Sequence, residues 1–592
     1  MKSFFKTLLA TILGSFISLF ITAVIIIAIV VGAIGGMTGA LNGDSDEKAL
    51  SENQVLGFTF SRPILERVKH SPFEKLDIPI QLASNAISLV DVKKAIKKAG
   101  EEDNIKAIFM NLSDVQASFA VIEEIRNTLI EFKKSGKKVY CYGEWMSEKA
   151  YYLASVSDKI FMSPEGILEF NGLVAEVLFF KKMLDKIGVE PIIFRVGKYK
   201  SAVEPLIRED MSEASKLQVS MFLEGIYNKV VADISTSRGI DQPSLRMISD
   251  SLKVRSIDDA VKYQLIDGAY YYDEVISDLK SSVGIGEDKL IKLTSIDEFL
   301  DIDYFEEEDS DNSKDHIAIV VAEGEIRDGK SDEGVVGSID MSNVFRQLRK
   351  EDHVKAVVLR INSPGGSALA SDVMWREIKE TAKVKPVIAS MSGMAASGGY
   401  YIAIACDEII AHEHTITGSI GVFGVLANVQ KLMEDKLGIT TDRVKTGEFA
   451  DLATPFRSME EEDRAIIQNG VDRIYKTFIT KVAKARNMKV SEVNEVAGGR
   501  VWTGLQAKEK GLVDKIGGLE DAIASAQIKI DKDLKIVYYP KYEGFWGKSH
   551  FDDQVKESIL SDPDLNKLVE SINNVKKMNG IQARMSFDLE IK

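Results

Sequence analysis

The residues with the clearest potential for chemistry are a serine and two glycines in Met394-Ala-Ala-Ser-Gly-Gly-Tyr400. We expect Ser397 between the end of a strand and the start of a helix, where its hydroxyl can face a cleft. The Gly398 N–H would then lie in the first helical turn, where backbone donors have no intrahelical acceptor. A hydroxyl beside an unused backbone donor suits nucleophilic attack on a carbonyl group.

A second glycine turn lies about 30 residues upstream, in Asn362-Ser-Pro-Gly-Gly-Ser367. Gly365 and Gly366 follow a proline, and glycine lets the backbone bend and approach a substrate closely. Two backbone donors aimed at one point form an oxyanion hole, which typically lowers a reaction barrier by ~2.7–4 kcal/mol per donor. Ala-Ser-Gly-Gly alone is also compatible with a tight turn and a helix N-cap. The two turns together favour a catalytic interpretation.

A nucleophilic serine needs a base, and no histidine has a sequence context typical of a catalytic triad. The histidines are His70, His316, His353, His412, His414 and His550. His412 and His414 alternate along a strand-like stretch, but no third metal ligand is in view, so ordinary surface or core histidines are the favoured interpretation. The other available base is a lysine whose pKa is lowered by burial.

The chain contains an internal repeat. Ile105-Lys-Ala-Ile-Phe-Met110 resembles Val354-Lys-Ala-Val-Val-Leu359, and Ala150-Tyr-Tyr-Leu-Ala154 resembles Gly399-Tyr-Tyr-Ile-Ala403. Both pairs have the same offset of 249 residues (354 − 105 and 399 − 150). A constant offset over this length predicts two tandem copies of one structural unit.

The two copies differ at the serine and at the glycine turn. With the offset of 249, Ser397 corresponds to Glu148. The Pro-Gly-Gly loop of residues 362–367 corresponds to residues 113–118, which contain no glycine. The candidate nucleophile and its candidate oxyanion donors are therefore confined to the second copy.

A candidate lysine lies in the first copy. Gly197-Lys-Tyr-Lys-Ser-Ala202 aligns with Gly447-Glu-Phe-Ala-Asp-Leu452, so Lys200 corresponds to Ala450. The copy with the candidate serine thus lacks the lysine, and the copy with the lysine lacks the serine. This pattern is expected if the two domains each contribute one residue to a single shared site. Spacing alone leaves a second interpretation equally open, in which Lys198 and Lys200 are solvated surface charges.

Short apolar runs alternate with helical patterns, which predicts an α/β fold with mostly parallel strands and right-handed crossovers. We expect strands at His316–Ala322, Val354–Ile361 and Pro386–Met391, and helices at Ile122–Phe132, at Ala370–Ala382 and from Gly399 onward. We predict a cytoplasmic tip and membrane anchor (1–47), two α/β domains (50–300, supplying the lysine, and 316–540, supplying the serine), an acidic linker (301–315) and a tail of unknown role (541–592).

Composition excludes several classes of protein. A hydrophobic content of 45% and a charged content of 28% over 592 residues exclude a largely disordered chain. The net charge of −15, with no basic stretch in the soluble part, makes nucleic acid a poor partner. Two cysteines exclude a disulfide framework, and both lie in apolar runs, where buried small residues are expected.

The N-terminal segment predicts a transmembrane helix. No charged residue occurs from Thr7 to Gly43, a length sufficient to cross a bilayer. Lys2 and Lys6 precede this segment, so the positive-inside rule places a short tip in the cytoplasm and the remaining chain outside. A cleaved signal peptide is the alternative, but its apolar core would span only ~7–15 residues.

These residues together resemble signal peptide peptidase A in its long, tandem-domain form, a family of serine–lysine peptidases. The resemblance covers the chain to about residue 540 and rests on four motifs: Gly197–Pro205, Asn362–Ser367, Met394–Tyr400 and Thr417–Gly421. It implies two tandem crotonase/Clp-like α/β domains after the N-terminal transmembrane helix. No departure from the family pattern is present at these positions.

The resemblance also implies roles for individual residues. Ser397 would be the nucleophile, Lys200 the general base, and Ser419 a residue that orients the lysine amine. Backbone N–H groups of Gly398 and of the Gly365-Gly366 turn would bind the oxyanion. The resemblance leaves open which of the two turn glycines points toward the oxyanion. No cofactor, metal or nucleotide would be required.

The family further implies a homotetramer that degrades cleaved signal peptides and other apolar or unfolded peptides at the outer face of the bacterial inner membrane. Its catalytic body would be periplasmic and its N-terminus cytoplasmic. Two other functions stay open: an acyl-CoA enzyme, because crotonase-like enzymes resemble this fold and its paired glycines, and a membrane scaffold that has lost catalytic activity.

Overall fold

The computed structural model describes residues 54–68, 86–301, 314–332, 334–540, 580–585 and 590–591. The expected membrane anchor and most of the acidic linker lie outside these residues. Within the described part, no helix combines the length and the apolar character that crossing a membrane requires.

The first lobe is a six-stranded sheet in the order β10-β1-β4-β5-β6-β9, and all its paired strands are parallel. Its strands are β1 (Gln54–Phe58), β4 (Ile105–Asn111), β5 (Lys138–Met146), β6 (Lys159–Leu168), β9 (Gly268–Ala269) and β10 (Lys292–Thr294). Its helices are α2 (Leu89–Glu101), α3 (Phe119–Lys133), α4 (Glu148–Ala154), α7 (Glu213–Arg238), α8 (Gln242–Asp250), α9 (Ile257–Lys262), α10 (Tyr272–Ser282) and α11 (Ile296–Asp301). The helix expected at Ile122–Phe132 is the middle of α3, which Ser118 caps at its N-terminus.

The second lobe repeats this design with strands in the order β20-β18-β16-β14-β11-β22 and with β17 and β21 beside β16. Its strands are β11 (His316–Glu323), β14 (Val354–Ser363), β16 (Val387–Ala396), β17 (Glu408–Ala411), β18 (Ile416–Gly418), β20 (Val501–Thr503), β21 (Lys515–Ile516) and β22 (Lys535–Tyr539). Its helices are α13 (Ser338–Lys350), α14 (Ala368–Ala382), α15 (Gly398–Ala403), α16 (Glu461–Arg486), α17 (Val490–Val496), α18 (Gly504–Glu509) and α19 (Leu519–Ile530). The pairs are parallel except for β18 with β20.

Strand β16 is longer than its apolar run suggested, because it ends at Ala396 rather than Met391. Its first part pairs with β17 through residues 388–391, and its last part pairs with β18 through residues 394–396. Because of this extension, Ser397 is the first residue after the strand.

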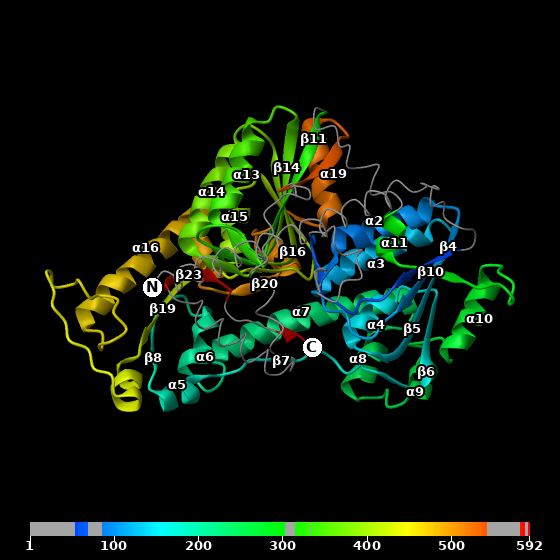
Figure 1. Ribbon diagram of the computed structural model, residues 1–592, viewed down its shortest axis with the longest axis horizontal. Coiled ribbons are helices and arrows are strands. Elements are labelled where there is room, and N and C mark those ends of the chain that lie inside the picture. The colour runs from blue at the N-terminus through cyan, green and yellow to red at the C-terminus, as the bar shows by residue number, and fades with distance from the viewer. Residues whose placement is uncertain are drawn as a thin grey trace, which may run out of the picture.

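A third sheet joins the two halves of the chain, in the order β13-β12-β15-β23-β19-β8. Its strands are β8 (Glu190–Val196), β12 (Glu325–Arg327), β13 (Val335–Gly337), β15 (Gly365–Ser367), β19 (Val422–Asn428) and β23 (Gly580–Arg584). Strand β8 comes from the first half, between α5 (Lys181–Ile187) and α6 (Glu204–Ile207), and β23 comes from the C-terminal tail. Figure 1 shows β8 and β23 beside β19, far from the first sheet.

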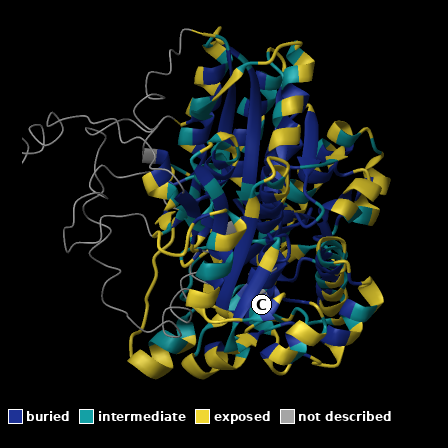
Figure 2. Cartoon of the chain, turned by 90° about the vertical axis from the view of Figure 1, so that its right-hand side faces the viewer, coloured by how far each residue is buried: buried dark blue, intermediate teal, exposed yellow. Residues whose placement is uncertain are grey.

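The strands form the buried interior of both lobes, and the helices that cover them have a buried side and an exposed side (Figure 2).

A buried ion network connects the two lobes. Arg360 on β14 is 1% exposed, and its guanidinium lies 2.8 Å from Glu66 and 2.5 Å from Glu124 on α3. Lys93 on α2 lies 2.5 Å from the same Glu124. Separating the lobes would remove both carboxylate partners of Arg360, and breaking a buried ion pair in this way is costly.

Candidate active site

Ser397 occupies the turn between β16 and α15. Its φ of 54° and ψ of −108° form a conformation that costs a residue other than glycine ~1–3 kcal/mol. The Ser397 N–H donates to the Gly418 carbonyl (2.8 Å), and the Tyr401 N–H donates to the Ser397 carbonyl (2.8 Å). Because the side chain makes no N-cap hydrogen bond, the hydroxyl is available to a different partner.

Lys200 reaches the second lobe on an arm of the first. Strand β8 pairs antiparallel with β19 over its whole length, and the chain then turns at Gly197, where φ is +105°. A Cβ on Gly197 would lie 2.4 Å from the backbone of Gly498, and a Cβ on Gly499 would lie 2.6 Å from the Lys200 nitrogen. Only glycines allow these two backbones to touch here.

A buried glutamine on α7 fixes the end of the arm. Gln218 is 1% exposed, its side-chain amide donates to the Tyr199 carbonyl (3.1 Å), and its amide oxygen accepts from the Val501 N–H (3.3 Å). The residue before Lys200 is thereby linked to β20 of the second lobe.

The lysine and the serine meet within one chain. Lys200 Nζ lies 2.8 Å from Ser397 Oγ, 3.0 Å from Ser419 Oγ and 3.0 Å from the Ser419 carbonyl oxygen. All three residues are 0% exposed. Burial holds the pKa of Lys200 well below its ordinary value of 10.5, and among the described residues no carboxylate pairs with it to restore the charge.

The three contacts match the hydrogen-bonding capacity of a neutral amine. A deprotonated lysine has two N–H donors and one lone pair. The Ser419 carbonyl can only accept, so one N–H donates to it, and the second N–H can donate to Ser419 Oγ. The lone pair then faces the Ser397 hydroxyl, which is the geometry required for removing its proton.

Ser419 owes its position to β18 and β20. It follows directly after β18, with a φ of 48°, and its N–H donates to the carbonyl of Arg500 (2.7 Å), the residue before β20. The carbonyl and the hydroxyl of this one residue therefore both contact Lys200 and restrict the direction of the amine.

The Pro-Gly-Gly turn packs against the serine turn. A Cβ on Gly365, whose φ is +94°, would lie 2.6 Å from the Gly398 nitrogen. The Gly365 N–H donates to Ser363 Oγ (3.2 Å), so it is engaged within its own turn. Gly366 and Gly398 are therefore the stronger candidates for oxyanion donors.

Ser397 does not face an open cleft, in contrast to the expectation from its position. Ser397 is 0% exposed, and β23 pairs with β15, the strand that begins at Gly365. A Cβ on Gly365 would lie 2.2 Å from the Ala583 carbonyl oxygen, and a Cβ on Gly398 would lie 2.9 Å from the same atom. The tail backbone thus contacts both glycine-bearing turns.

Two contributors escaped the sequence analysis. The first is Gly498-Gly499, for which two consecutive glycines before a strand were the available signal. The second is the segment Gly580–Met585, in which apolar Ile581, Ala583 and Met585 alternate with Gln582 and Arg584. This alternation is typical of a strand, but six residues without a predicted partner did not reveal where the strand docks.

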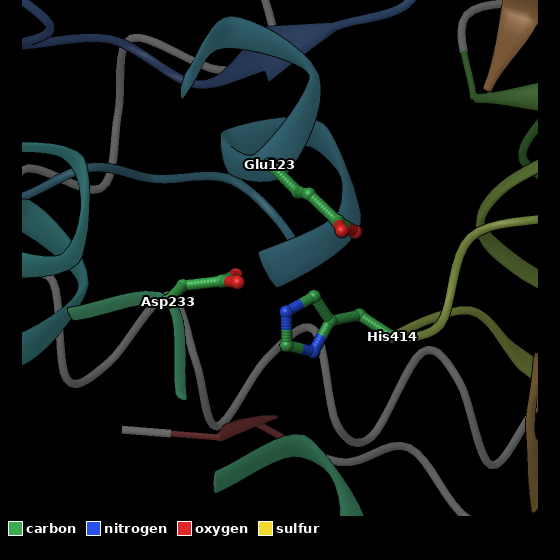
Figure 3. A group of neighbouring side chains, drawn as sticks. All are labelled: Glu123, Asp233 and His414. Atoms are coloured by element: carbon green, nitrogen blue, oxygen red, sulfur yellow. The ribbon is translucent and has the colours of Figure 1, made fainter. Parts of the chain in front are cut away.

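The two histidines at positions 412 and 414 are both buried, and His414 joins Glu123 and Asp233 in a group whose ligand atoms lie within 4.8 Å of one another (Figure 3). Two carboxylates that could act as metal ligands therefore lie near His414. However, the Lys229 ammonium lies 2.6 Å from Asp233 and 3.3 Å from Glu123, and the Tyr152 hydroxyl donates to Asp233 (2.6 Å). His412 Nδ1 also lies 3.4 Å from Glu123, so two cationic side chains face the two carboxylates and we interpret the group as an ion network between the lobes.

Comparison with protein families supplies the context for this geometry. The model of peptidase family S49 matches residues 131–286 and 379–534, and the Clp protease model matches residues 323–415. The chain belongs to peptidase family S49. The two S49 matches begin 248 residues apart (379 − 131), which confirms the tandem repeat and the mixed α/β fold with Clp-protease-like character.

Curated proteins with similar sequences align with most of this chain. Protease 4 of Haemophilus influenzae is 36% identical over 455 residues, which cover 74% of this chain and 73% of the relative. Protease 4 of Salmonella typhi is 36% identical, with 76% and 74% covered. The chloroplastic serine protease SPPA of Arabidopsis thaliana is 35% identical, with 76% and 67% covered. This S49 chain is accordingly a serine peptidase.

Proposed function

We propose that this S49 peptidase is an endopeptidase with a serine–lysine dyad. In this proposal Ser397 is the nucleophile, Lys200 is the general base, and Ser419 orients the amine. The backbone N–H groups of Gly398 and Gly366 bind the oxyanion. The observation that carries the proposal is the 2.8 Å contact between Lys200 Nζ and Ser397 Oγ, where neither residue is exposed.

The proposed mechanism uses one proton carrier throughout. Neutral Lys200 removes the proton of Ser397, whose oxygen attacks the peptide carbonyl and forms a tetrahedral oxyanion. The ammonium then protonates the leaving amine, and an acyl-enzyme remains. Lys200 next removes a proton from water, the resulting hydroxide attacks the ester, and the proton returns to Ser397 as the acid product leaves.

The substrates we propose are cleaved signal peptides and other apolar or unfolded peptides at the outer face of the bacterial inner membrane. The uncharged segment from Thr7 to Gly43 supports this assignment, because an anchor there would hold the site beside a membrane-embedded peptide. Lys2 and Lys6 before it support a cytoplasmic N-terminus and a periplasmic catalytic body.

We also propose that the chain assembles into a homotetramer through exchange of arms. Within one chain, β8 of the first half pairs with β19 of the second half. The aligned arm of the second half, residues 440–446, is exposed along its whole length, with Val444 at 99%. Pairing of this arm with the first half of a neighbouring copy would be a head-to-tail contact, which forms a ring of four copies when the rotation between neighbours is about 90°.

Sedimentation velocity tests the arm. Val444→Pro removes a backbone donor from it, and the expected result is dissociation of the tetramer into smaller species. A monomeric wild type, or an unchanged tetramer in the variant, would count against arm exchange.

Turnover of a synthetic signal peptide by the detergent-solubilised full chain tests the dyad. We expect cleavage by the wild type, acylation of Ser397 by a serine-directed probe, and loss of both in Ser397→Ala, whereas Ser147→Ala in the first lobe should retain both. An inactive wild type that resists the probe would favour the membrane scaffold. Turnover of acyl-CoA thioesters without peptide cleavage would favour the crotonase-like alternative.

A further inference from the structure

The Pro-Gly-Gly turn is held by a side-chain pair at the end of the strand beside it. Strand β11 ends at Glu323, which lies opposite Asn362 in the parallel pairing of β11 with β14. The Asn362 side-chain amide donates to the Glu323 carboxylate (3.1 Å). Hydrogen bonds to an ionised acceptor are roughly twice as strong as those between neutral groups. The first residue of the turn motif is thus fixed through its side chain.

The backbone beside this pair continues the restraint into the turn. The Gly324 N–H donates to the Asn362 carbonyl (2.9 Å), and the Ser363 hydroxyl donates to the Gly324 carbonyl (2.6 Å). Ser363 Oγ in turn accepts from the Gly365 N–H (3.2 Å). The chain then enters β12, which pairs with β15 at Gly366. A shift at the end of β11 would therefore displace the whole turn.

Strand β14 needs this restraint because its regular pairing is interrupted at the same place. Ile361 lies opposite Met391 on β16, but Ser363 lies opposite Ala395, so the register shifts at Asn362. Irregularities of this kind occur beside active sites, where they re-aim the chain. Ala395 is two residues before the candidate nucleophile. The contact with Glu323 supplies a restraint where the ladder between β14 and β16 does not.

The first lobe anchors the other side of Glu323. Glu66, which follows β2 (Ile64–Leu65), donates its N–H to both oxygens of the Glu323 carboxylate (3.1 and 3.0 Å). The Glu66 carboxylate lies 2.8 Å from the guanidinium of Arg360, two residues before Asn362 on β14. Glu66 is 2% exposed, so these contacts form only when the two lobes are docked.

The Glu–Asn pair belongs to the lobe that carries the serine. The first residues of β1 and β11 are 262 residues apart (316 − 54), and each pairs with the first residue of the next strand, β4 or β14. With the offsets of 262 and 249, Glu323 corresponds to Ser61 and Asn362 corresponds to Ser113. The first lobe has neither the carboxylate nor the amide at these positions, and it also lacks the glycine turn.

We propose that Glu323 and Asn362 are positioning residues that hold the turn of residues 363–366 in the orientation required to bind the oxyanion. The inference rests on the proposed peptidase site, in which the Gly366 N–H is a donor, and adds a pair that acts through this turn. The first lobe then contributes twice to catalysis: it supplies Lys200, and the Glu66 N–H anchors the turn. A misplaced donor weakens binding of the transition state more than binding of the substrate.

Exchanging the two functional groups tests the pair in the full chain. Asn362→Asp removes the donor and places a second carboxylate opposite Glu323. We expect kcat for a short fluorogenic peptide to fall at least ~10-fold, with KM within ~3-fold of the wild type. In the double variant Glu323→Gln/Asn362→Asp, the new amide can donate to the new carboxylate and its carbonyl can accept from the Glu66 N–H. This variant should recover kcat to within ~3-fold of the wild type.

The matched control is Ser113→Asp, the same side chain at the corresponding exposed position of the first lobe, which should leave kcat unchanged. A double variant no more active than Asn362→Asp alone would overturn the proposal, because a general loss of packing would not be repaired by the exchange.

Amide hydrogen exchange separates this proposal from the proposed catalysis, since it requires no cleavage. Exchange in residues 361–370 should quicken at least ~10-fold in Asn362→Asp and return to the wild-type rate in the double variant. That pattern in a wild type that cleaves no peptide would support the pair and overturn the dyad. Unchanged exchange and unchanged kcat in Asn362→Asp, with Ser397→Ala inactive, would overturn the pair and leave the dyad intact.

Discussion

The turn between β5 and α4 in the first lobe and the turn between β16 and α15 in the second lobe are equivalent elements in different conformations. Tyr151 on α4 donates to the Leu265 carbonyl, and Tyr400 on α15 donates to the Leu512 carbonyl, both at 2.8 Å. These paired contacts align the helices with the offset of 249 residues and place Glu148 opposite Ser397.

The first-lobe turn is relaxed. Ser147, one residue before Glu148, has a φ of −68° and a ψ of 162°, and its hydroxyl caps α4 by accepting from the Ala150 N–H (3.3 Å). The Glu148 carboxylate accepts from the N–H groups of Asn171 (3.0 Å) and Gly172 (2.8 Å). Burial raises the pKa of Glu148 to about 7.

The second-lobe turn is strained, and its serine does not cap the helix that follows. Ser397 has a positive φ and makes no cap hydrogen bond, and its oxygen instead contacts Lys200. Strain of this kind persists only where the surrounding structure enforces it. The shared fold therefore does not require a strained turn at this position. The strain is present only in the lobe whose serine hydroxyl contacts Lys200.

The largest expected effect comes from replacing Lys200, the proposed general base. Lys200→Arg keeps a long cationic side chain but cannot release its proton near neutral pH, so kcat/KM should fall at least ~10³-fold at every pH. Wild-type kcat/KM should rise with pH as the lowered pKa of Lys200 is passed, because only the neutral amine accepts the serine proton. Parallel pH–rate profiles measure both, and an active arginine variant would refute the assignment.

Stability offers an independent readout of the same lysine. Between its lowered folded pKa and 10.5, the unfolded chain binds a proton that the folded chain does not, so the free energy of unfolding rises with pH in that window. Lys200→Met should remove this slope and stabilise the protein near neutral pH. Denaturant unfolding at several pH values distinguishes the two curves.

The next effect comes from giving the second lobe a side chain that the first lobe tolerates. Gln116 is exposed at the position that corresponds to Gly365. Gly365→Ala would place a Cβ 2.6 Å from the Gly398 nitrogen, so we expect kcat/KM to fall ~10²-fold or more, comparable to losing an oxyanion donor. Gln116→Ala is the matched control and should leave the rate unchanged. Equal rates in both variants would mean that the turn is not part of the site.

A smaller effect is expected at Glu148, the first-lobe residue that corresponds to the proposed nucleophile Ser397. The folded pKa of Glu148 (about 7) exceeds its ordinary value of 4.5, so between these values the folded state holds a proton that the unfolded state has lost. Wild-type stability therefore falls as pH rises through that window. Glu148→Gln should gain on the order of 2–3 kcal/mol over the wild type above pH 7. Superimposable unfolding curves at pH 8 would contradict the buried, protonatable carboxyl.

The smallest effect distinguishes a cap from a nucleophile. Ser147→Ala removes the N-cap of α4 and should lower the free energy of unfolding by ~1 kcal/mol, with kcat unchanged. Urea unfolding followed by circular dichroism, combined with a peptide-cleavage assay, measures both. Loss of activity without loss of stability would contradict the division of roles between the two turns.

Residue types and one constant offset were sufficient to predict the α/β repeat, because apolar periodicity and turn glycines act locally. They also singled out Ser397 and made Lys200 a candidate, because complementary loss between two copies can be read without coordinates, whereas the roles of Lys200 and Ser419 came from the resemblance to a known peptidase family. Tertiary structure alone decided that the amine and the hydroxyl meet within one chain, since that contact depends on β8 crossing to β19. It alone also showed that residues 580–584 pair with β15 and β19 beside the glycine turns, because strand pairing between distant segments depends on edges that only the folded sheet presents.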